Sequence, residues 1–304
     1  MPRHHYVSQF ILERWASNGQ LSAFSWNPNA QRVINDPVSV KNACQIRNLN
    51  APYGVPRAQS NKVEDIFTQQ IDTPAARALA VILSDGVDRL TDEQRISWAR
   101  FIVAFAVRTP ETLRKMGPIE TRNGLEVARN RAKGPADSEA IVTKLIEENM
   151  SSIERNMPLG IAVELSLDME KIYAVAAMDW WVRRFEKRKI LLGDRPLLAK
   201  PRMPYPCGIP LNNQSCLIAL PIAPDAIFFA SGNNKNRAET RKMSPNRLIR
   251  LVNDETISCA DKYVYSADSS MAALITKRLV SKIQDEQQGI SPRPLNIPRD
   301  KRMV

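Results

Sequence analysis

Apolar residues in the first 176 positions recur mainly at the three- and four-residue spacing of amphipathic helices. We predict helices over residues 6–16, 61–84, 92–115 and 137–176. Pro74 and Pro110 are expected to kink or interrupt two of them, and Pro158–Gly160 to break a third. Because Trp98–Val107 is apolar on nearly every side, it is expected to be the central buried helix.

Shorter apolar runs bounded by turn residues predict strands. Leu21–Trp26 and Gln31–Ile34 flank an Asn-Pro-Asn turn and are expected to form a hairpin. After residue 177 the pattern changes to strand-like runs separated by turns rich in Pro and Asn. These runs cover residues 180–185, 189–192, 216–221, 226–230 and 263–265, with helices expected at 245–253 and 271–285.

The order of these elements predicts an α+β fold. We expect a mainly helical N-terminal two-thirds with a small N-terminal β-hairpin, and a short antiparallel sheet in the C-terminal third. One domain is predicted over residues 1–286, with a helical part at about 1–176 and a strand-containing part at about 177–286. Residues 287–304 carry three prolines and four Lys or Arg residues, and we expect them to be a basic, disordered tail.

The charge balance of the 304 residues points to polyanionic partners. Lys and Arg number 43 against 32 Asp and Glu, a formal net charge of +11. Such an excess attracts nucleic acid at long range and gains from counterion release, so nucleic acid is the predicted partner. The apolar run Phe101–Val107 is too short to span a bilayer, and no apolar signal segment follows Met1. We therefore predict a cytoplasmic protein without a membrane partner.

The usual catalytic signatures are missing from the sequence. It contains no P-loop, no dinucleotide-binding glycine motif, no Gly-x-Ser-x-Gly elbow and no His-Glu-x-x-His. Its four cysteines form no Cys-x-x-Cys pair and its two histidines are adjacent, which argues against structural zinc and favours reduced thiols. P-loop nucleotide hydrolysis is excluded.

The N-terminal residues His4–Gln9 are the remaining candidate for chemistry. If a helix begins here, His5 and Gln9 lie one turn apart on one face and can reach the same ligand. Histidine suits proton transfer near neutral pH as well as metal binding. The alternative is that His5 caps or packs a helix and His4 is exposed.

A family resemblance supports this location. Residues His5–Trp15 read His-Tyr-Val-Ser-Gln-Phe-Ile-Leu-Glu-Arg-Trp, which resembles the opening of the bacterial family known as domain of unknown function 4238. That family begins with His-Tyr-Val-Pro-Gln-Phe. The resemblance spans roughly residues 4 to 268, and its further points are Ser39–Ala43, Glu64, Asp72, Arg108–Pro110, Leu191–Pro196 and Leu220–Pro224.

The chain departs from the family pattern at three positions. Ser8 stands where the family has proline, and Gly193 and Arg195 replace Ser and Asn around Asp194. The resemblance implies where a site lies, and it supplies no reaction.

Arg108 and Asp194 are expected to meet His5 and Gln9. Arg108 ends the most apolar helix, where a charge needs a partner, and Asp194 follows an apolar strand. One interpretation is a buried salt bridge that locks the helical part to the strand part. The other is a catalytic pocket in which His5 acts as acid, base or metal ligand and Arg108 holds a phosphate.

Three acidic residues on the first long helix have two interpretations. Glu64 and Asp72 are eight residues apart, about two helical turns, and can share a face with each other. Together with His5 they could hold a divalent metal ion for phosphodiester hydrolysis. Alternatively, with Asp65, they form a solvated acidic edge.

Two basic stretches, residues 183–202 and 235–250, could form one cationic face for a phosphate backbone. Trp180 and Trp181 lie nearby and are candidates for base stacking, with the core as the alternative. The residues predicted to bind nucleic acid are Arg183, Arg184, Lys187, Arg188, Lys189, Arg241 and Lys242.

The leading hypothesis is a nucleic-acid-directed nuclease or phosphodiesterase, which would suit bacterial defence or a toxin. Its catalytic residues would be His5, Gln9, Arg108 and Asp194, and its candidate cofactor is a divalent metal ion at His5, Glu64 and Asp72. The first alternative is a non-catalytic module that binds nucleic acid or protein and contains a structural His/Arg/Asp cluster. The second is an enzyme acting on a small anionic substrate.

Overall fold

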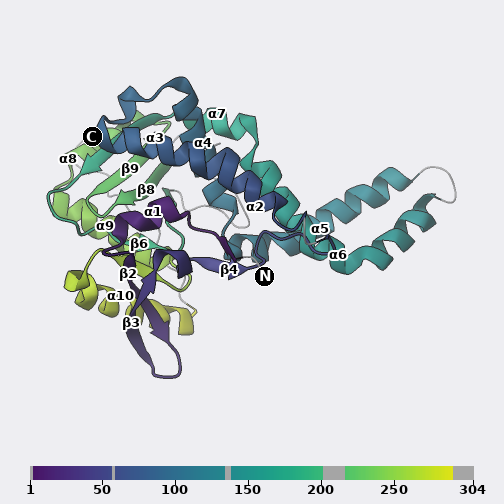
Figure 1. Ribbon diagram of the computed structural model, residues 1–304, viewed down its shortest axis with the longest axis horizontal. Helices are drawn as coiled ribbons and strands as arrows, with labels where there is room; N and C mark the ends of the chain where they lie inside the picture. Colours follow the sequence, from purple (N-terminus) through teal and green to yellow (C-terminus); the bar gives the residue numbers. More distant parts are fainter. Residues whose placement is uncertain (1–2, 57–58, 134–137, 201–215, 290–304) are drawn as a thin grey trace.

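The computed structural model describes residues 3–56, 59–133, 138–200 and 216–289. Figure 1 shows a body of helices and sheets from which a pair of long helices projects. The α-helices are α1 (Gln9–Leu12), α2 (Lys62–Ile66), α3 (Thr73–Ser84), α4 (Asp92–Val107), α5 (Pro110–Ala132), α6 (Ser138–Ser166), α7 (Met169–Ala176), α8 (Asn234–Lys242), α9 (Pro245–Cys259) and α10 (Ala272–Gln287).

The strands fall into three antiparallel sheets, which confirms the predicted α+β class. They are β1 (Arg3–His5), β2 (Gln20–Asn27), β3 (Arg32–Ser39), β4 (Gln45–Arg47), β5 (Asp179–Arg184), β6 (Leu192–Gly193), β7 (Leu198–Lys200), β8 (Leu217–Ala223), β9 (Ala226–Ser231) and β10 (Val264–Ser266). The strand orders are β1-β4, β3-β2-β10-β6 and β5-β9-β8-β7.

Helix α4 is the centre of the core, as its apolar pattern predicts. Thr91 and Gln94 form the expected capping box, and every residue from Ser97 to Val107 except Arg100 is buried. Helices α3, α6 and α7 pack around it. The ring of Trp98 meets the edge of Phe228 from β9 at 5.7 Å, which joins the helix to the sheet β5-β9-β8-β7.

The N-terminal hairpin does not stand alone. Strand β2 pairs with β3 as predicted, and it also pairs with β10, with Phe24 opposite Val264. Strand β10 in turn pairs with β6. In the same region the indole nitrogen of Trp15 donates to the carbonyl oxygen of Ile190 at 2.8 Å. Strands from residues 20–27 and 264–266 therefore share one sheet.

Pro74 splits the predicted helix over residues 61–84 in an unexpected way. A π-helix (Phe67–Asp72) separates α2 from α3, and Pro74 occupies the first turn of α3. Proline has no N–H group, so the carbonyl of Gln70 four residues earlier loses its usual α-helical donor. A guanidinium nitrogen of Arg100 on α4 donates to that carbonyl at 3.3 Å.

Helices α5 and α6 form the projecting arm (Figure 1). The predicted interruption at Pro110 is confirmed as the start of α5, with Thr109 as its N-cap. The predicted break at Pro158–Gly160 is wrong, because α6 runs through Pro158 to Ser166. The helices lie so close that a Cβ added to Gly117 would stand 2.8 Å from Cγ of Pro158.

Several elements have too little sequence signal to be predicted. Strands β1, β4 and β7 have three residues each, and α8 is almost entirely polar. None of the described helices is long and apolar enough to cross a membrane. The expected basic tail begins at the end of α10, and from residue 290 onward it lies outside the described residues.

Candidate functional site

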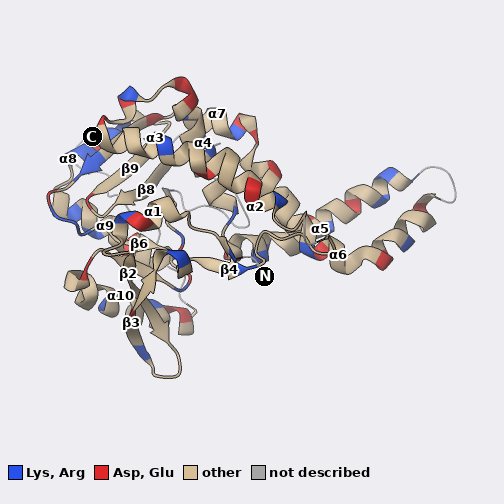
Figure 2. Cartoon of the chain, viewed as in Figure 1, with Lys and Arg blue, Asp and Glu red and all other residues tan. Residues whose placement is uncertain are grey.

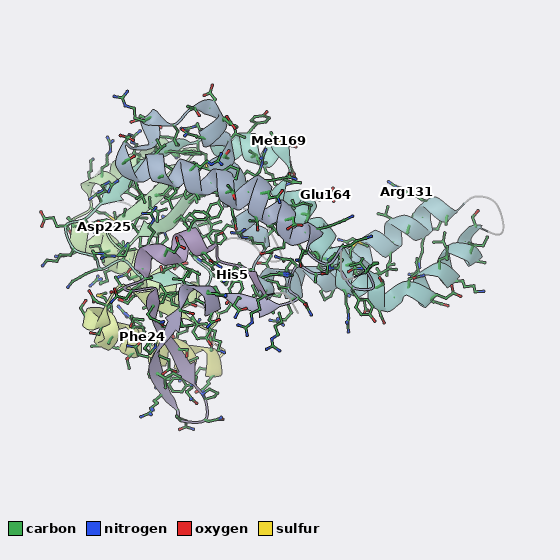
Figure 3. The ribbon with its side chains drawn as sticks, viewed as in Figure 1. His5, Phe24, Arg131, Glu164, Met169 and Asp225 are labelled. Atoms are coloured by element: carbon green, nitrogen blue, oxygen red, sulfur yellow. The ribbon has the colours of Figure 1, made fainter. Side chains whose placement is uncertain are left out.

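His5 lies at the end of β1, where the chain turns into α1 (Figure 3). The expectation that His5 and Gln9 share one helix is wrong, because His5 belongs to a strand paired with β4 and α1 begins at Gln9. The two side chains still meet. The amide nitrogen of Gln9 is 3.3 Å from both ring nitrogens of His5.

The contacts of the His5 ring assign its tautomer. Nε2 lies 3.1 Å from the carbonyl oxygen of Lys41. A carbonyl only accepts hydrogen bonds, so Nε2 carries the hydrogen of the neutral ring and Nδ1 holds the lone pair. The amide of Gln9 is then placed to donate to Nδ1.

Burial lowers the pKa of His5 below its usual 6.5. The Lys41 carbonyl and the negative charges of Glu64 and Asp72 oppose this shift without cancelling it. His5 is therefore a mainly neutral, half-buried imidazole at neutral pH, which is the protonation state of a general base.

His4 is buried, so the expectation that it is exposed is wrong. Its Nδ1 accepts the backbone N–H of Asn50 at 2.8 Å, and its Nε2 is buried with no hydrogen-bond partner among the described residues. The side chain of Asn50 donates to Oε2 of Glu64 at 2.7 Å. His4 thus fixes the loop that carries Asn50 against β1.

Two guanidinium nitrogens of Arg108 are held by hydrogen bonds within the fold. Its guanidinium donates to Oδ1 of Asp72 at 2.7 Å and to the hydroxyl of Ser8, and it lies over the rings of Phe101 and Phe105. Only 2% of the Arg108 side chain is exposed. The expected pairing of Arg108 with Asp194 is wrong; Asp72 is the partner, because α3 and α4 pack side by side.

Asp194 lies in a different environment. Its carboxylate accepts the backbone N–H groups of Asp261, Lys262 and Tyr263 at 2.8 to 2.9 Å. Burial raises the pKa of Asp194, while these three hydrogen bonds act in the opposite direction. Asp194 therefore fastens the α9–β10 connection to β6, and none of its hydrogen bonds within the described part of the chain goes to His5.

Gly193 explains one departure from the family pattern. A Cβ at this position would lie 3.3 Å from both the methyl group and the carbonyl oxygen of Thr256 on α9. The absence of a side chain at Gly193 allows α9 to approach β6 closely.

The predicted metal site is not supported. Within the described parts of the chain, no group of three or more His, Cys, Asp or Glu side chains could hold a metal ion. The carboxylate of Glu64 accepts from Asn50 and that of Asp72 from Arg108, so both are engaged by other groups of the fold. Asp65 is exposed, as the alternative of a solvated edge predicts.

The two predicted basic stretches meet in space. A guanidinium nitrogen of Arg183 on β5 donates to the carbonyl oxygen of Thr240 on α8, although the residues are 57 positions apart. Figure 2 shows Lys and Arg positions, coloured blue, on α8 and on the neighbouring end of the sheet. Sequence reasoning expected one cationic face from these two stretches, and the structure places them side by side.

Most of the predicted nucleic-acid ligands on these stretches are exposed. Arg184 is held to the carbonyl of Leu83 and Arg188 to that of Arg14, so their charges are not neutralised by carboxylates in these contacts. Trp180 and Trp181 are 2% and 3% exposed, so they belong to the core and cannot stack on bases. Of the predicted nucleic-acid ligands, those with exposed side chains are Arg184, Lys187, Arg188, Lys189, Arg241 and Lys242.

Several residues of the cluster were not predicted. Asn50 carries no sequence signal, because its role comes from the contact with His4 and Glu64. In the sequence Ser8 is only a departure from the family pattern, yet its hydroxyl accepts a hydrogen bond from the guanidinium of Arg108. A proline in its place would offer no hydroxyl to that guanidinium.

The comparisons with known proteins agree with the opening motif. A family model described as "Protein of unknown function (DUF4238)" matches residues 3–270, which confirms the resemblance. No curated protein and no solved structure matches the chain.

Proposed function

The chain belongs to the DUF4238 family, and we propose that it is a non-catalytic module that binds the phosphate backbone of nucleic acid. The observation that carries this proposal is the meeting of the two basic stretches at the contact between Arg183 and Thr240. The cluster around His5 then has a structural role, and it joins β1, α1, α3 and α4.

The exposed cations suit contacts with phosphate groups. They extend from the loop after β5, which holds Lys187, Arg188 and Lys189, to the last turn of α8 with Arg241 and Lys242. Contacts of this kind position a nucleic acid without reading its sequence. The net charge of +11 adds long-range attraction for the same class of ligand.

The buried state of the predicted catalytic residues supports a structural role for the His5 cluster. Arg108 and Asp194 are 2% and 1% exposed; the guanidinium of Arg108 pairs with the carboxylate of Asp72, and the carboxylate of Asp194 accepts three backbone N–H groups. Neither side chain can contact a phosphate group that approaches from solvent. A buried ion pair of this kind specifies a structure without requiring a ligand.

Salt-dependent binding tests the proposal. We expect the full chain to bind a 20-base-pair DNA duplex, or RNA of the same sequence, with an affinity that falls steeply between about 50 and 200 mM salt. The variant K187Q/K189Q should lower the slope of log affinity against log salt by about 2. The matched control R129Q/R131Q removes two exposed cations from the arm and should leave the slope unchanged.

Two results would contradict nucleic-acid binding. One is an affinity that does not depend on salt, and the other is an equal effect of both double variants. Capture of an acidic protein by the same surface, in the absence of any nucleic-acid affinity, would also replace this proposal.

A second candidate function is phosphodiester cleavage with His5 as general base. The observation that favours it is the neutral imidazole of His5, whose Nδ1 lone pair faces the amide of the exposed Gln9. We expect such an enzyme to lose cleavage in the variant H5Q while its melting temperature and nucleic-acid affinity stay unchanged. If H5Q lowers stability and no cleavage is found with or without added Mg²⁺, the structural role stands.

A further inference from the structure

We propose that the pocket between α8 and the N-terminal end of α4 binds a phosphate monoester, the group that ends a nucleic acid strand or belongs to a free mononucleotide. The residues of the pocket favour a phosphate monoester whatever molecule carries it. That this molecule is a nucleic acid strand rests on the proposed function.

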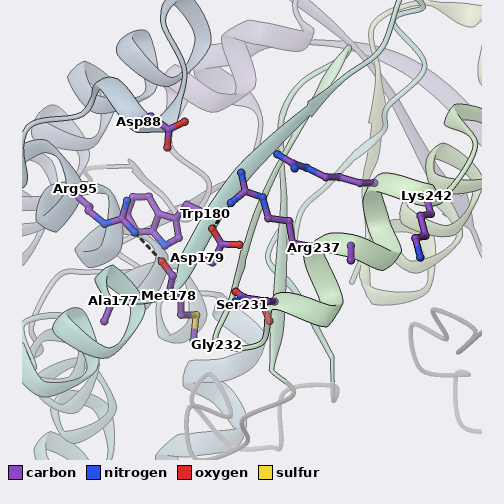
Figure 4. A pocket seen from close by; sticks show the side chains of 13 residues that line it. Asp88, Arg95, Ala177, Met178, Asp179, Trp180, Ser231, Gly232, Arg237 and Lys242 are labelled. Carbon is purple, nitrogen blue, oxygen red and sulfur yellow. Dashed lines mark hydrogen bonds and ion pairs between the residues drawn. The ribbon is translucent and has the colours of Figure 1, made fainter. Parts of the chain in front are cut away.

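The pocket is an open cavity of about 970 Å³ that three parts of the fold enclose. Asp88 lines it from the short turn before α4 and Arg95 from the beginning of α4, and residues 177–180 line it where α7 leads into β5. Helix α8 forms the opposite wall with Arg237 and its last turn. Figure 4 shows Arg95 and Trp180 on one side of the pocket, and Arg237 and Lys242 extending from α8 on the other.

The charge of the lining matches a dianion. Four cations, Arg95, Arg237, Arg241 and Lys242, stand against the two carboxylates of Asp88 and Asp179, so the lining carries a net charge of +2. A phosphate monoester carries about −1.5 to −2 at pH 7, whereas each diester of the backbone carries −1. The pocket therefore favours a terminal phosphate over an internal one.

Two of the cations are held rigidly in place. The guanidinium of Arg95 donates to the carbonyl oxygens of Ala176 and Met178, both at 2.7 Å, and lies 4.0 Å above the ring of Trp180. Arg237 donates to Oδ1 of Asp179 at 2.6 Å, and within the part of the chain that the structure describes its Nε is buried without a hydrogen-bond partner. Such fixed guanidiniums are suited to binding an anion without further ordering.

A third observation concerns the mutual repulsion of cations beside the pocket. Burial and the like charge of Arg241 together lower the pKa of Arg183. Arg183 binds neutral carbonyl oxygens of Thr240 and Met243, so these contacts do not compensate its charge. A phosphate bound next to Arg241 would relieve this repulsion.

The pocket is separate from the His5 cluster. Arg95 and Arg108 lie near opposite ends of α4, so the two sites are about 20 Å apart at a rise of 1.5 Å per residue. Arg241 and Lys242, by contrast, belong to both the pocket and the proposed nucleic-acid surface. A strand that lies along this surface can therefore place its end in the pocket.

The test compares strand ends on the full chain. Twelve-nucleotide single strands of one sequence would carry a 5′-phosphate, a 3′-phosphate or hydroxyl groups at both ends, and their binding would be measured by fluorescence anisotropy. We expect one of the phosphorylated strands to bind about tenfold more tightly than the hydroxyl strand, the order expected of one charge-assisted hydrogen bond. R241Q/K242Q should abolish this difference in affinity. The single variant K242Q should reduce it.

The matched control is R247Q/R250Q, which removes two exposed cations of α9 that do not line the pocket. This control should keep the preference for the phosphorylated end. Inorganic phosphate and adenosine monophosphate serve as competitors that test the free sources of the same group.

The outcomes separate the two proposals. Equal affinity for hydroxyl and phosphorylated strands overturns the pocket and leaves backbone binding in place. Binding of adenosine monophosphate or inorganic phosphate that R241Q/K242Q removes, without binding of any strand, supports the pocket and overturns nucleic-acid binding. If no strand and no free phosphate binds, both proposals fail.

Discussion

Arg108 donates to Asp72 at 2.7 Å and thereby ties the C-terminal end of α4 to the π-helix that precedes α3. The pair is asymmetric in burial, because 21% of the Asp72 side chain is exposed against 2% for Arg108. Loss of the carboxylate therefore leaves a buried charge without compensation, whereas loss of the guanidinium leaves an acid that water can still reach.

The first prediction follows from this asymmetry. Asp72→Asn should lower the free energy of unfolding by about 3 kcal/mol, measured by urea denaturation. The double variant D72N/R108M should recover most of this loss, because methionine suits the space above Phe101 and Phe105. Asp65→Asn, at an exposed position of α2, is the control and should change stability by less than about 0.5 kcal/mol. A D72N variant as stable as the wild type would show that the pair is unimportant.

The second prediction concerns pH. Because burial lowers the pKa of His5, the unfolded state binds a proton more readily than the folded state as pH falls through 6.5. The stability that neutral His5 provides is complete above pH 6.5 and is lost as pH falls through the lower folded pKa. Wild-type protein should thus lose more stability than H5Q between pH 7.5 and 5.5.

Proton NMR gives the direct measurement of that pKa. The chain has two histidines, so the ring signals of His5 are assigned by comparison with H5Q. A titration midpoint at or above 6.5 would contradict the prediction.

The third prediction distinguishes a structural Asp194 from a catalytic one. Asp194→Ala leaves three backbone N–H groups without their acceptor, and we expect a loss of about 3 kcal/mol or more. Nucleic-acid affinity, measured below the melting temperature of the variant, should stay at the wild-type value. Asp36→Ala, at an exposed position of β3, provides the control. An Asp194→Ala protein of normal stability that has lost cleavage would instead place this carboxylate in a reaction.

The fourth prediction concerns Gly117 and Gly124, the two glycines of α5. A Cβ at Gly124 would meet the flexible end of Met157 at 2.9 Å, whereas one at Gly117 would meet the ring of Pro158 at 2.8 Å. Gly124→Ala should therefore gain up to about 1 kcal/mol of helix propensity, because Met157 can move aside. Gly117→Ala should lose about 1 kcal/mol or more, because a proline ring cannot.

Hydrogen exchange of the amides in α5 and α6 reports the stability of the arm directly. We expect faster exchange in Gly117→Ala and unchanged or slower exchange in Gly124→Ala. The same response in both variants would argue against close packing at Gly117.

The helical core could be predicted because its signal is local. The apolar stretch Trp98–Val107 and the capping box at Thr91 each determine structure over a few neighbouring residues. Helix α8 could not be predicted in this way, since Ala238 is the only apolar residue among Asn234–Lys242 and no periodicity arises. Its place in the fold depends on packing against β5 and β9.

The candidate site was predicted only in part for a similar reason. The charge of Arg108 at the end of an apolar helix indicated an acidic partner, and the partner expected was Asp194. Asp72 and Arg108 lie at similar distances before and after the connection between α3 and α4, which brings them together once the helices pack side by side. Counting residues from the connection along the two antiparallel helices would have indicated Asp72 as the partner of Arg108. The role of Asp194 depends on backbone groups near residue 262, which no side-chain pattern reveals.

The pairing of β2 with β10 also constrains how the chain folds during synthesis. The hairpin β2-β3 leaves the ribosome early, and its partner strand follows roughly 240 residues later, a delay on the order of ten seconds or more at usual translation rates. Until then one edge of β2 has no neighbour and remains open to association with other nascent chains. A product truncated before residue 264 would therefore contain a hairpin that cannot complete its sheet.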